Sequence, residues 1–185
     1  MSYQPLSELV PLIEAKLGLC QGFFDSLDSD KENDWSFVIK AHALAEAAVS
    51  YLLTEALRRP ELADPFSRLD MSNKATGKAA FVKALGLLGE PERRFVSAFS
   101  ELRNRLVHDV RNVNFDLLEH VEALGMKERE TFLKNFNIIS SEVTDDVRNL
   151  FRFDPRQALW YSTMAFLGIV YLNTQPGKLS GGNPK

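Results

Sequence analysis

An arginine, an asparagine and a histidine lie close together in the sequence, at Arg103, Asn104 and His108. Histidine titrates near neutral pH and can serve as a base or an acid, while arginine presents paired donors to a phosphate group. Asparagine can orient the imidazole or hold a phosphate oxygen. These residue types suit cleavage of RNA by its own 2′-hydroxyl without a metal ion, so the three residues form the predicted catalytic group.

The spacing of this group decides how it can act. On a helix Asn104 and His108 share a face, whereas Arg103 and His108 are separated by about 140° around the axis. A second copy of the motif across a dimer axis would supply what one helix lacks. A structural interpretation stands beside the catalytic one: His108 caps the helix C-terminus, and Arg103 and Asn104 join a buried polar network.

Arginines surround the motif and favour local contacts with phosphate groups. Ordinary solvated charge is the plainer interpretation of the same pattern. The predicted RNA-binding residues are Arg94, Arg105 and Arg111, and a second run follows at Arg148, Arg152 and Arg156.

Other polar residues give weaker signals. His42 and Glu46 have the spacing of a metal-binding pair, but a chain with three histidines and one cysteine favours a polar seam between helices. Lys74, Gly77 and Lys78 could hold an anion near a helix start, although the phosphate-loop pattern is missing. The sequence therefore predicts no metal site and no cofactor.

Composition indicates one globular domain. The chain has 185 residues, of which 45% are hydrophobic and 25% charged, and its net charge of −3 argues against bulk attraction to nucleic acid. The single cysteine, Cys20, stands in an apolar context and is predicted to lie in the core, which fits a cytoplasmic protein. There is no signal-peptide pattern, and the apolar stretch 159–172 is too short to span a bilayer, so no membrane contact is expected.

Apolar periodicity predicts the elements that position these residues. A long helix begins after Asp34, its expected cap, and has a wide apolar face with one narrow polar seam at His42, Glu46, Ser50 and Thr54. The motif lies near the end of a later helix. The predicted helices cover residues 7–27, 35–58, 72–88, 92–108, 115–124, 127–136 and 155–171. The prediction is an all-α, up-down bundle of four main helices plus shorter C-terminal helices, forming one domain over 1–173 with a disordered tail over 174–185.

The segment from Glu101 to Asp109 resembles the Arg-Asn-x-x-x-His signature of the HEPN superfamily. The preceding order, a helix ending near residues 84–88, a short turn and the motif helix, is similar too. The resemblance covers roughly residues 35–111 and implies a HEPN-like bundle. It also implies that an acidic residue of the long helix faces the motif helix. Glu46 is the candidate to pair with Arg103 or His108, and Asp109 could support the imidazolium in the same way.

Two branches of the superfamily look most similar. HEPN toxins carry a tyrosine two residues after the histidine, where this chain has Val110. That branch implies an RNA-directed homodimer, a metal-independent endoribonuclease of toxin or defence type, with an antitoxin as partner. The mannitol operon repressor family has a long helix similar to residues 37–47, and it implies a non-catalytic regulatory or protein-interaction module.

Overall fold

The computed structural model describes residues 6–28, 33–73 and 75–175. Every regular element in these ranges is a helix, which confirms the all-α prediction. The α-helices are α1 (Leu6–Lys16), α2 (Phe23–Asp28), α3 (Asp34–Leu57), α4 (Ala63–Arg68), α5 (Lys78–Ala84), α6 (Glu90–Val107), α7 (Leu117–Ala123), α8 (Met126–Phe136), α9 (Asp145–Phe153) and α10 (Pro155–Asn173). Two 3-10 helices, η1 (Pro60–Leu62) and η2 (Val110–Asn114), connect them.

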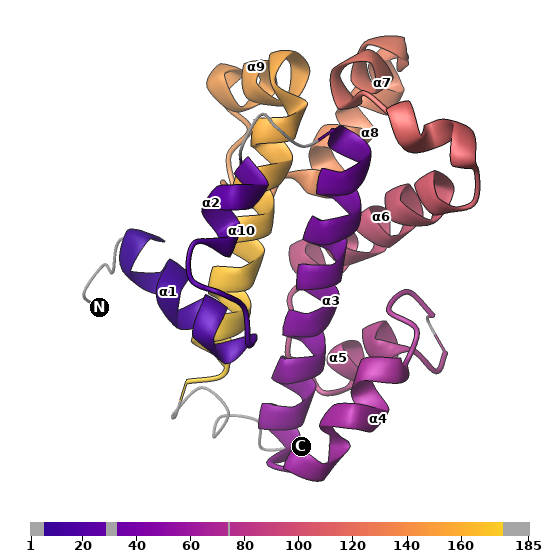
Figure 1. Ribbon diagram of the computed structural model, residues 1–185. Helices are drawn as coiled ribbons and strands as arrows, with labels where there is room; N and C mark the ends of the chain where they lie inside the picture. The colour runs from indigo at the N-terminus through magenta and orange to yellow at the C-terminus, as the bar shows by residue number, and fades with distance from the viewer. Residues whose placement is uncertain (1–5, 29–32, 74, 176–185) are drawn as a thin grey trace.

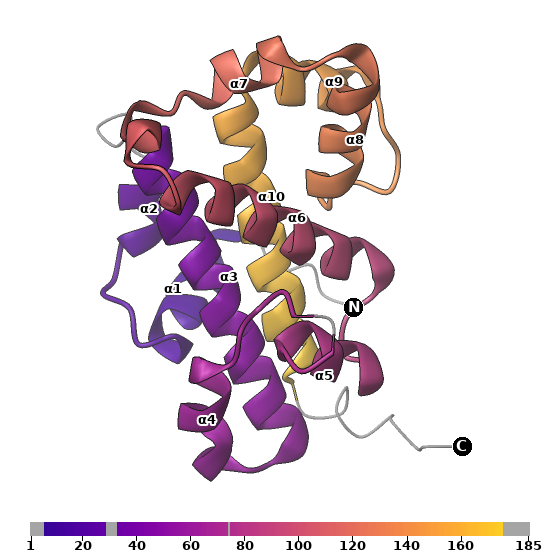
Figure 2. The same cartoon turned by 90° about the vertical axis from the view of Figure 1, so that its right-hand side faces the viewer.

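Helices α3 and α10 run side by side through the middle of the molecule (Figures 1 and 2). Both bury most of their apolar residues, including Phe37, Leu52 and Leu53 of α3 and Phe166 of α10. Removing one such side chain leaves a cavity that costs about 2–5 kcal/mol, so the pair forms a firm frame. Within the described ranges α3 alone is long and apolar enough to cross a membrane, and 67% of its apolar window is buried inside the protein.

The start of α3 differs by one residue from the prediction. Asn33, not Asp34, is the cap, because its side-chain oxygen accepts a hydrogen bond from the Ser36 amide at 2.9 Å. Asp34 is the first helical residue and ties α3 to distant segments. Its carboxylate accepts from the Leu117 amide at 2.7 Å and pairs with the Arg156 guanidinium at 2.6 Å.

The predicted first helix is broken into α1 and α2. Gly18 and Gly22, which lie between α1 and α2, adopt positive φ angles of 69° and 79° that favour glycine. These angles interrupt the helical path. The buried Glu14 carboxylate holds the bend, since it accepts hydrogen bonds from the Gly22 amide at 3.0 Å and the Phe24 amide at 3.1 Å. Cys20 lies on this bend and is exposed, so its predicted place in the core was wrong.

The predicted helix over 72–88 is mostly a loop. Only α5 forms, and Gly77 rather than Ser72 precedes it. The loop folds back on itself because the backbone amides of Gly77 and Lys78 donate to the carbonyls of Asn73 and Asp70, both at 2.9 Å. The bond from Lys78 to Asp70 spans eight residues, which a continuous helix does not allow.

The rest of the chain follows the prediction with additions. Helices α6, α7, α8 and α10 match the predicted 92–108, 115–124, 127–136 and 155–171 within a few residues, whereas α4, α9 and the two 3-10 helices were not predicted. Helices α7, α8 and α9 gather at one end of the bundle, and α4 and α5 lie at the other (Figure 2). Of the tail predicted to be disordered, Thr174 is the C-cap of α10 and Gln175 follows it in a turn, and 176–185 lie outside the described residues.

Candidate functional site

A polar pocket of about 310 Å³ opens between α3, the segment from α4 to Ser72, and α6. It is lined by His42, Glu46, Ser67, Arg68, Leu69, Asp70, Met71, Ser72, Ser100, Arg103 and Asn104. The pocket thus brings the first two motif residues together with the polar seam of the long helix. We refer to it below as the polar pocket.

Arg103 and Asn104 lie at the edge of the face that α6 buries. Leu102 and Leu106 on that face are almost fully buried, which fixes the rotation of the helix and leaves Arg103 and Asn104 half-buried. The Arg103 Nη1 donates to Asn104 Oδ1 at 3.0 Å. In the part of the chain that the structure describes, no carboxylate forms an ion pair with Arg103. Arg103 is therefore a partly desolvated cation that forms no ion pair with a described residue, although Glu46 and Asp70 line the same pocket.

His108 stands apart from this pair. It is the C-cap of α6, and its backbone amide donates to the Asn104 carbonyl at 3.3 Å. Its side chain is exposed and does not line the polar pocket. Within one chain the structure thus gathers Arg103 and Asn104 but does not bring His108 to them.

The imidazole inside the polar pocket belongs to His42. Its Nε2 lies 3.0 Å from the buried Ser100 Oγ. Burial lowers the pKa of His42 below its usual value, and Arg103 and Lys78 lower it further against the opposing effects of Glu46 and Asp70. His42 is therefore neutral at pH 7. Sequence reasoning considered His42 with Glu46 as a metal-binding pair and preferred a polar seam, but it did not place His42 beside the motif residues.

Glu46 has a different partner from the one expected. Its Oε1 accepts from the Lys78 ammonium at 2.7 Å, and the Lys78 side chain is fully buried. The same ammonium donates to the Ser67 carbonyl at 3.3 Å. Lys78 is therefore a structural cation beneath the polar pocket, and it takes the carboxylate that was predicted to pair with Arg103 or His108.

The remaining predicted site residues are engaged elsewhere or point to solvent. Asp109 caps η2 and pairs with Arg111 at 2.6 Å, and this contact lowers the pKa of the Asp109 carboxyl. Arg94 pairs with Glu90 and donates to the Lys134 carbonyl. Arg105 is exposed. These arginines do not converge on the polar pocket.

The second arginine run is also dispersed. Arg148 pairs with Glu130, and Arg156 pairs with Asp34 and lies over the Phe37 ring at 4.6 Å. Arg152 lies on the separate helix α9, against Phe153. Residues spaced by four in the sequence thus fall on two helices, because Pro155 begins α10.

No family model, curated protein or solved structure matches this chain. The fold and site themselves define an all-helical protein with a polar pocket. Chemically, Arg103 can neutralise an anion, and Asn104 and neutral His42 can direct it by hydrogen bonds. In the described ranges, no three His, Cys, Asp or Glu side chains gather closely enough to hold a metal ion.

Proposed function

We propose that this chain is an RNA-directed protein of the HEPN type that cleaves RNA without a metal ion as a homodimer. The observation that supports this most is the state of Arg103. Its guanidinium lines a polar pocket of about 310 Å³, is bonded to Asn104, and has no ion-pair partner among the described residues. A phosphodiester matches such a site, since planar paired donors bind phosphate oxygens strongly.

The dimer follows from the position of His108. Because His108 lies outside the pocket that holds Arg103, a complete group needs His108 from a second chain. An exposed apolar patch beside His108 supports an interface there: Val107 is 36% exposed, Val110 86% and Val113 43%. Val110 and Val113 lie on one side of η2, because residues three apart eclipse in a 3-10 helix. We call Val107, Val110 and Val113 the valine patch.

In the proposed reaction the His108 imidazole of the second chain removes the proton from the 2′-hydroxyl, and the oxygen attacks the adjacent phosphorus. The bond to the 5′-oxygen breaks, and this oxygen takes the proton from the His108 imidazolium. The products are a 2′,3′-cyclic phosphate and a 5′-hydroxyl, with no net change in protons. Arg103 neutralises the charge that develops on the phosphate oxygens, and Asn104 fixes the guanidinium.

The direct test incubates purified protein with tRNA and mRNA in the presence of EDTA. The wild type should produce fragments, and Arg103→Gln and His108→Gln should each lose activity by about a hundredfold or more. Arg59→Gln is the matched control, because Arg59 is exposed and lies at the far end of α3 beside η1. Intact RNA with the wild type, together with no toxicity on expression, would exclude catalysis.

Mixing two inactive variants tests the shared site. If Arg103 of one chain acts with His108 of the other, a mixed dimer of Arg103→Gln and His108→Gln regains one of its two sites. An equimolar mixture should then recover about a quarter of the wild-type activity, because half of the dimers are mixed. Val110→Glu should give monomers in light scattering and should abolish activity. No recovery on mixing would refute a site shared between chains.

One observation favours a second function, a non-catalytic regulatory or protein-interaction module. The only imidazole in the polar pocket, His42, is held neutral by burial, and a neutral imidazole cannot donate a proton as an acid. In this case Arg103→Gln would weaken RNA or partner binding, and neither the wild type nor the variant would cleave RNA. His108→Ala would lower the melting temperature, whereas a purely catalytic His108 would leave it unchanged.

A further inference from the structure

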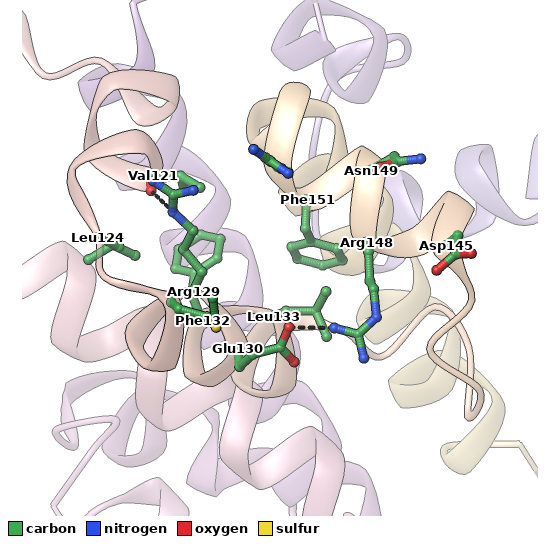
Figure 3. Close-up of a pocket in the computed structure, with 12 residues that line it drawn as sticks. Val121, Leu124, Arg129, Glu130, Phe132, Leu133, Asp145, Arg148, Asn149 and Phe151 are labelled. Carbon is green, nitrogen blue, oxygen red and sulfur yellow. Dashed lines mark hydrogen bonds and ion pairs between the residues drawn. The ribbon is translucent and has the colours of Figure 1, made fainter.

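A second, larger pocket lies among α7, α8 and α9, at the end of the bundle opposite α4 and α5 (Figure 2). It encloses about 590 Å³ and is shown in Figure 3. A neighbouring cavity of about 230 Å³ shares Val121, Arg129 and Arg152 with it. Pockets of this size accept small organic molecules. We refer to it as the α7–α9 pocket, and none of its lining residues lines the polar pocket.

The floor of the α7–α9 pocket is apolar and firmly packed. Phe151 is 2% exposed and points toward Leu133 across the pocket (Figure 3). The Phe132 ring lies 6.3 Å from that of Phe151 and 4.7 Å from that of Phe136, between centroids, which ties the floor to the core. An apolar body placed here would displace water from a preformed surface.

Three arginines surround this floor, and they differ in their hydrogen-bond and ion-pair partners. Arg148 pairs with Glu130, and Arg129 donates through Nε to the Val121 carbonyl at 3.0 Å. Arg152 lines both cavities, and its guanidinium lies 5.0 Å from the Phe153 ring centroid. Arg152 is exposed, and no residue in the described part of the chain forms a hydrogen bond or ion pair with its guanidinium.

The charge of the rim is therefore positive. Its acidic side chains are Glu130, which is neutralised by Arg148, and Asp145 in the first turn of α9, against three arginines. An unpaired guanidinium next to aromatic and aliphatic side chains complements a ligand with one anionic group and one apolar part.

We propose that the α7–α9 pocket binds a small organic monoanion, with its acid group on Arg152 and its apolar body on the floor formed by Phe132, Leu133 and Phe151. This site does not depend on the proposed ribonuclease activity. The ligand class is an organic acid, and its body is either an aliphatic chain or an aromatic ring.

The test uses 8-anilinonaphthalene-1-sulfonate, an aromatic monoanion whose fluorescence rises in apolar sites. Titration of the full chain should give a single saturable site. Arg152→Gln should weaken binding by about tenfold, because a charge-assisted contact is lost. Met126→Glu should weaken it by about fivefold, because a like charge enters the rim at a residue that is 84% exposed.

Controls separate this site from general stickiness. Arg59→Gln should bind within about twofold of the wild type, and all variants should keep their near-ultraviolet circular dichroism, since loosened states also bind this dye. N-phenyl-1-naphthylamine, which lacks the sulfonate, should bind weakly and should not respond to Arg152→Gln. Displacement by octanoate identifies an aliphatic acid, and displacement by 1-naphthoate an aromatic one. Displacement by neither, no saturable binding, or equal binding by Arg152→Gln would overturn the proposal.

Discussion

The buried ion pair between Lys78 and Glu46 predicts an unequal response to removal of its two members. The Lys78 side chain is fully buried, whereas the Glu46 side chain is 32% exposed at the polar pocket. We expect Glu46→Gln to destabilise the protein much more than Lys78→Met, because the first leaves an ammonium buried without its counter-charge.

The magnitudes follow from these exposures. Loss of one partner from a buried pair costs about 3–5 kcal/mol. Glu46→Gln should fall near the lower limit, at about 3 kcal/mol, because the Ser67 carbonyl and the new amide oxygen still accept from Lys78. Lys78→Met leaves a carboxylate that the pocket water can solvate, and methionine fills the buried space. Its cost should stay within about 1 kcal/mol, and the double variant should resemble it.

Urea unfolding followed by circular dichroism gives the free energy of unfolding of the wild type, the two single variants and the double variant. In a thermal melt of a chain of this size, Glu46→Gln should lower the melting temperature by about 6–12 °C. The exposed pair of Arg68 and Asp64, at 2.9 Å and with side chains 77% and 73% exposed, is the control. Arg68→Met should change the free energy of unfolding by less than about 1 kcal/mol. Equal costs for Glu46→Gln and Lys78→Met, or a larger cost for Lys78→Met, would refute the reasoning.

Two further predictions concern the dependence of stability on pH and the space around two glycines. Burial lowers the pKa of His42, so the unfolded chain binds its proton more readily; stability from this group is complete above about pH 6.5 and falls below it, by at most about 1.4 kcal/mol per pH unit. His42→Gln should flatten the change in urea midpoint between pH 7 and pH 5, and an unchanged slope would contradict this. Gly77→Ala would place a Cβ against the Asp70 carbonyl oxygen, closer than van der Waals contact allows, and should cost about 3 kcal/mol. In Gly125→Ala the added Cβ would lie 3.3 Å from the flexible Glu128 carboxylate, so this change should cost less than about 1 kcal/mol. Urea unfolding measures both glycine variants.

The long helices could be predicted because their patterns are local and repeated. The apolar face of α3 recurs over 24 residues, and Arg58 ends the helix with a left-handed φ of 53°. The segment before α5 could not be predicted in this way. The amides of Lys78 and Ala79 donate to the carbonyls of Asp70 and Met71, eight residues earlier, a spacing that helical periodicity does not indicate. Ser72 resembled a cap without acting as one.

The candidate site was predicted in part for the same reason. Arg103 and Asn104 are neighbours on one helix, so their common position in the polar pocket follows from α6 alone. The contact of Glu46 with Lys78 joins residues 32 apart through the folded loop, which periodicity does not reveal. His42 was visible as one end of a polar seam. The hydroxyls of Ser50 and Thr54 donate to carbonyls of their own helix. Of the seam, therefore, only His42 and Glu46 line the pocket.

The glycine bend between α1 and α2 has a practical consequence. Cys20, the single cysteine of the sequence, is exposed on this bend, which the Glu14 carboxylate holds in place. A spin label attached there needs no substitution and reports one position per molecule. In the proposed symmetric dimer the two labels would give a single distance by pulsed electron paramagnetic resonance. That distance would test whether the subunits meet at the valine patch.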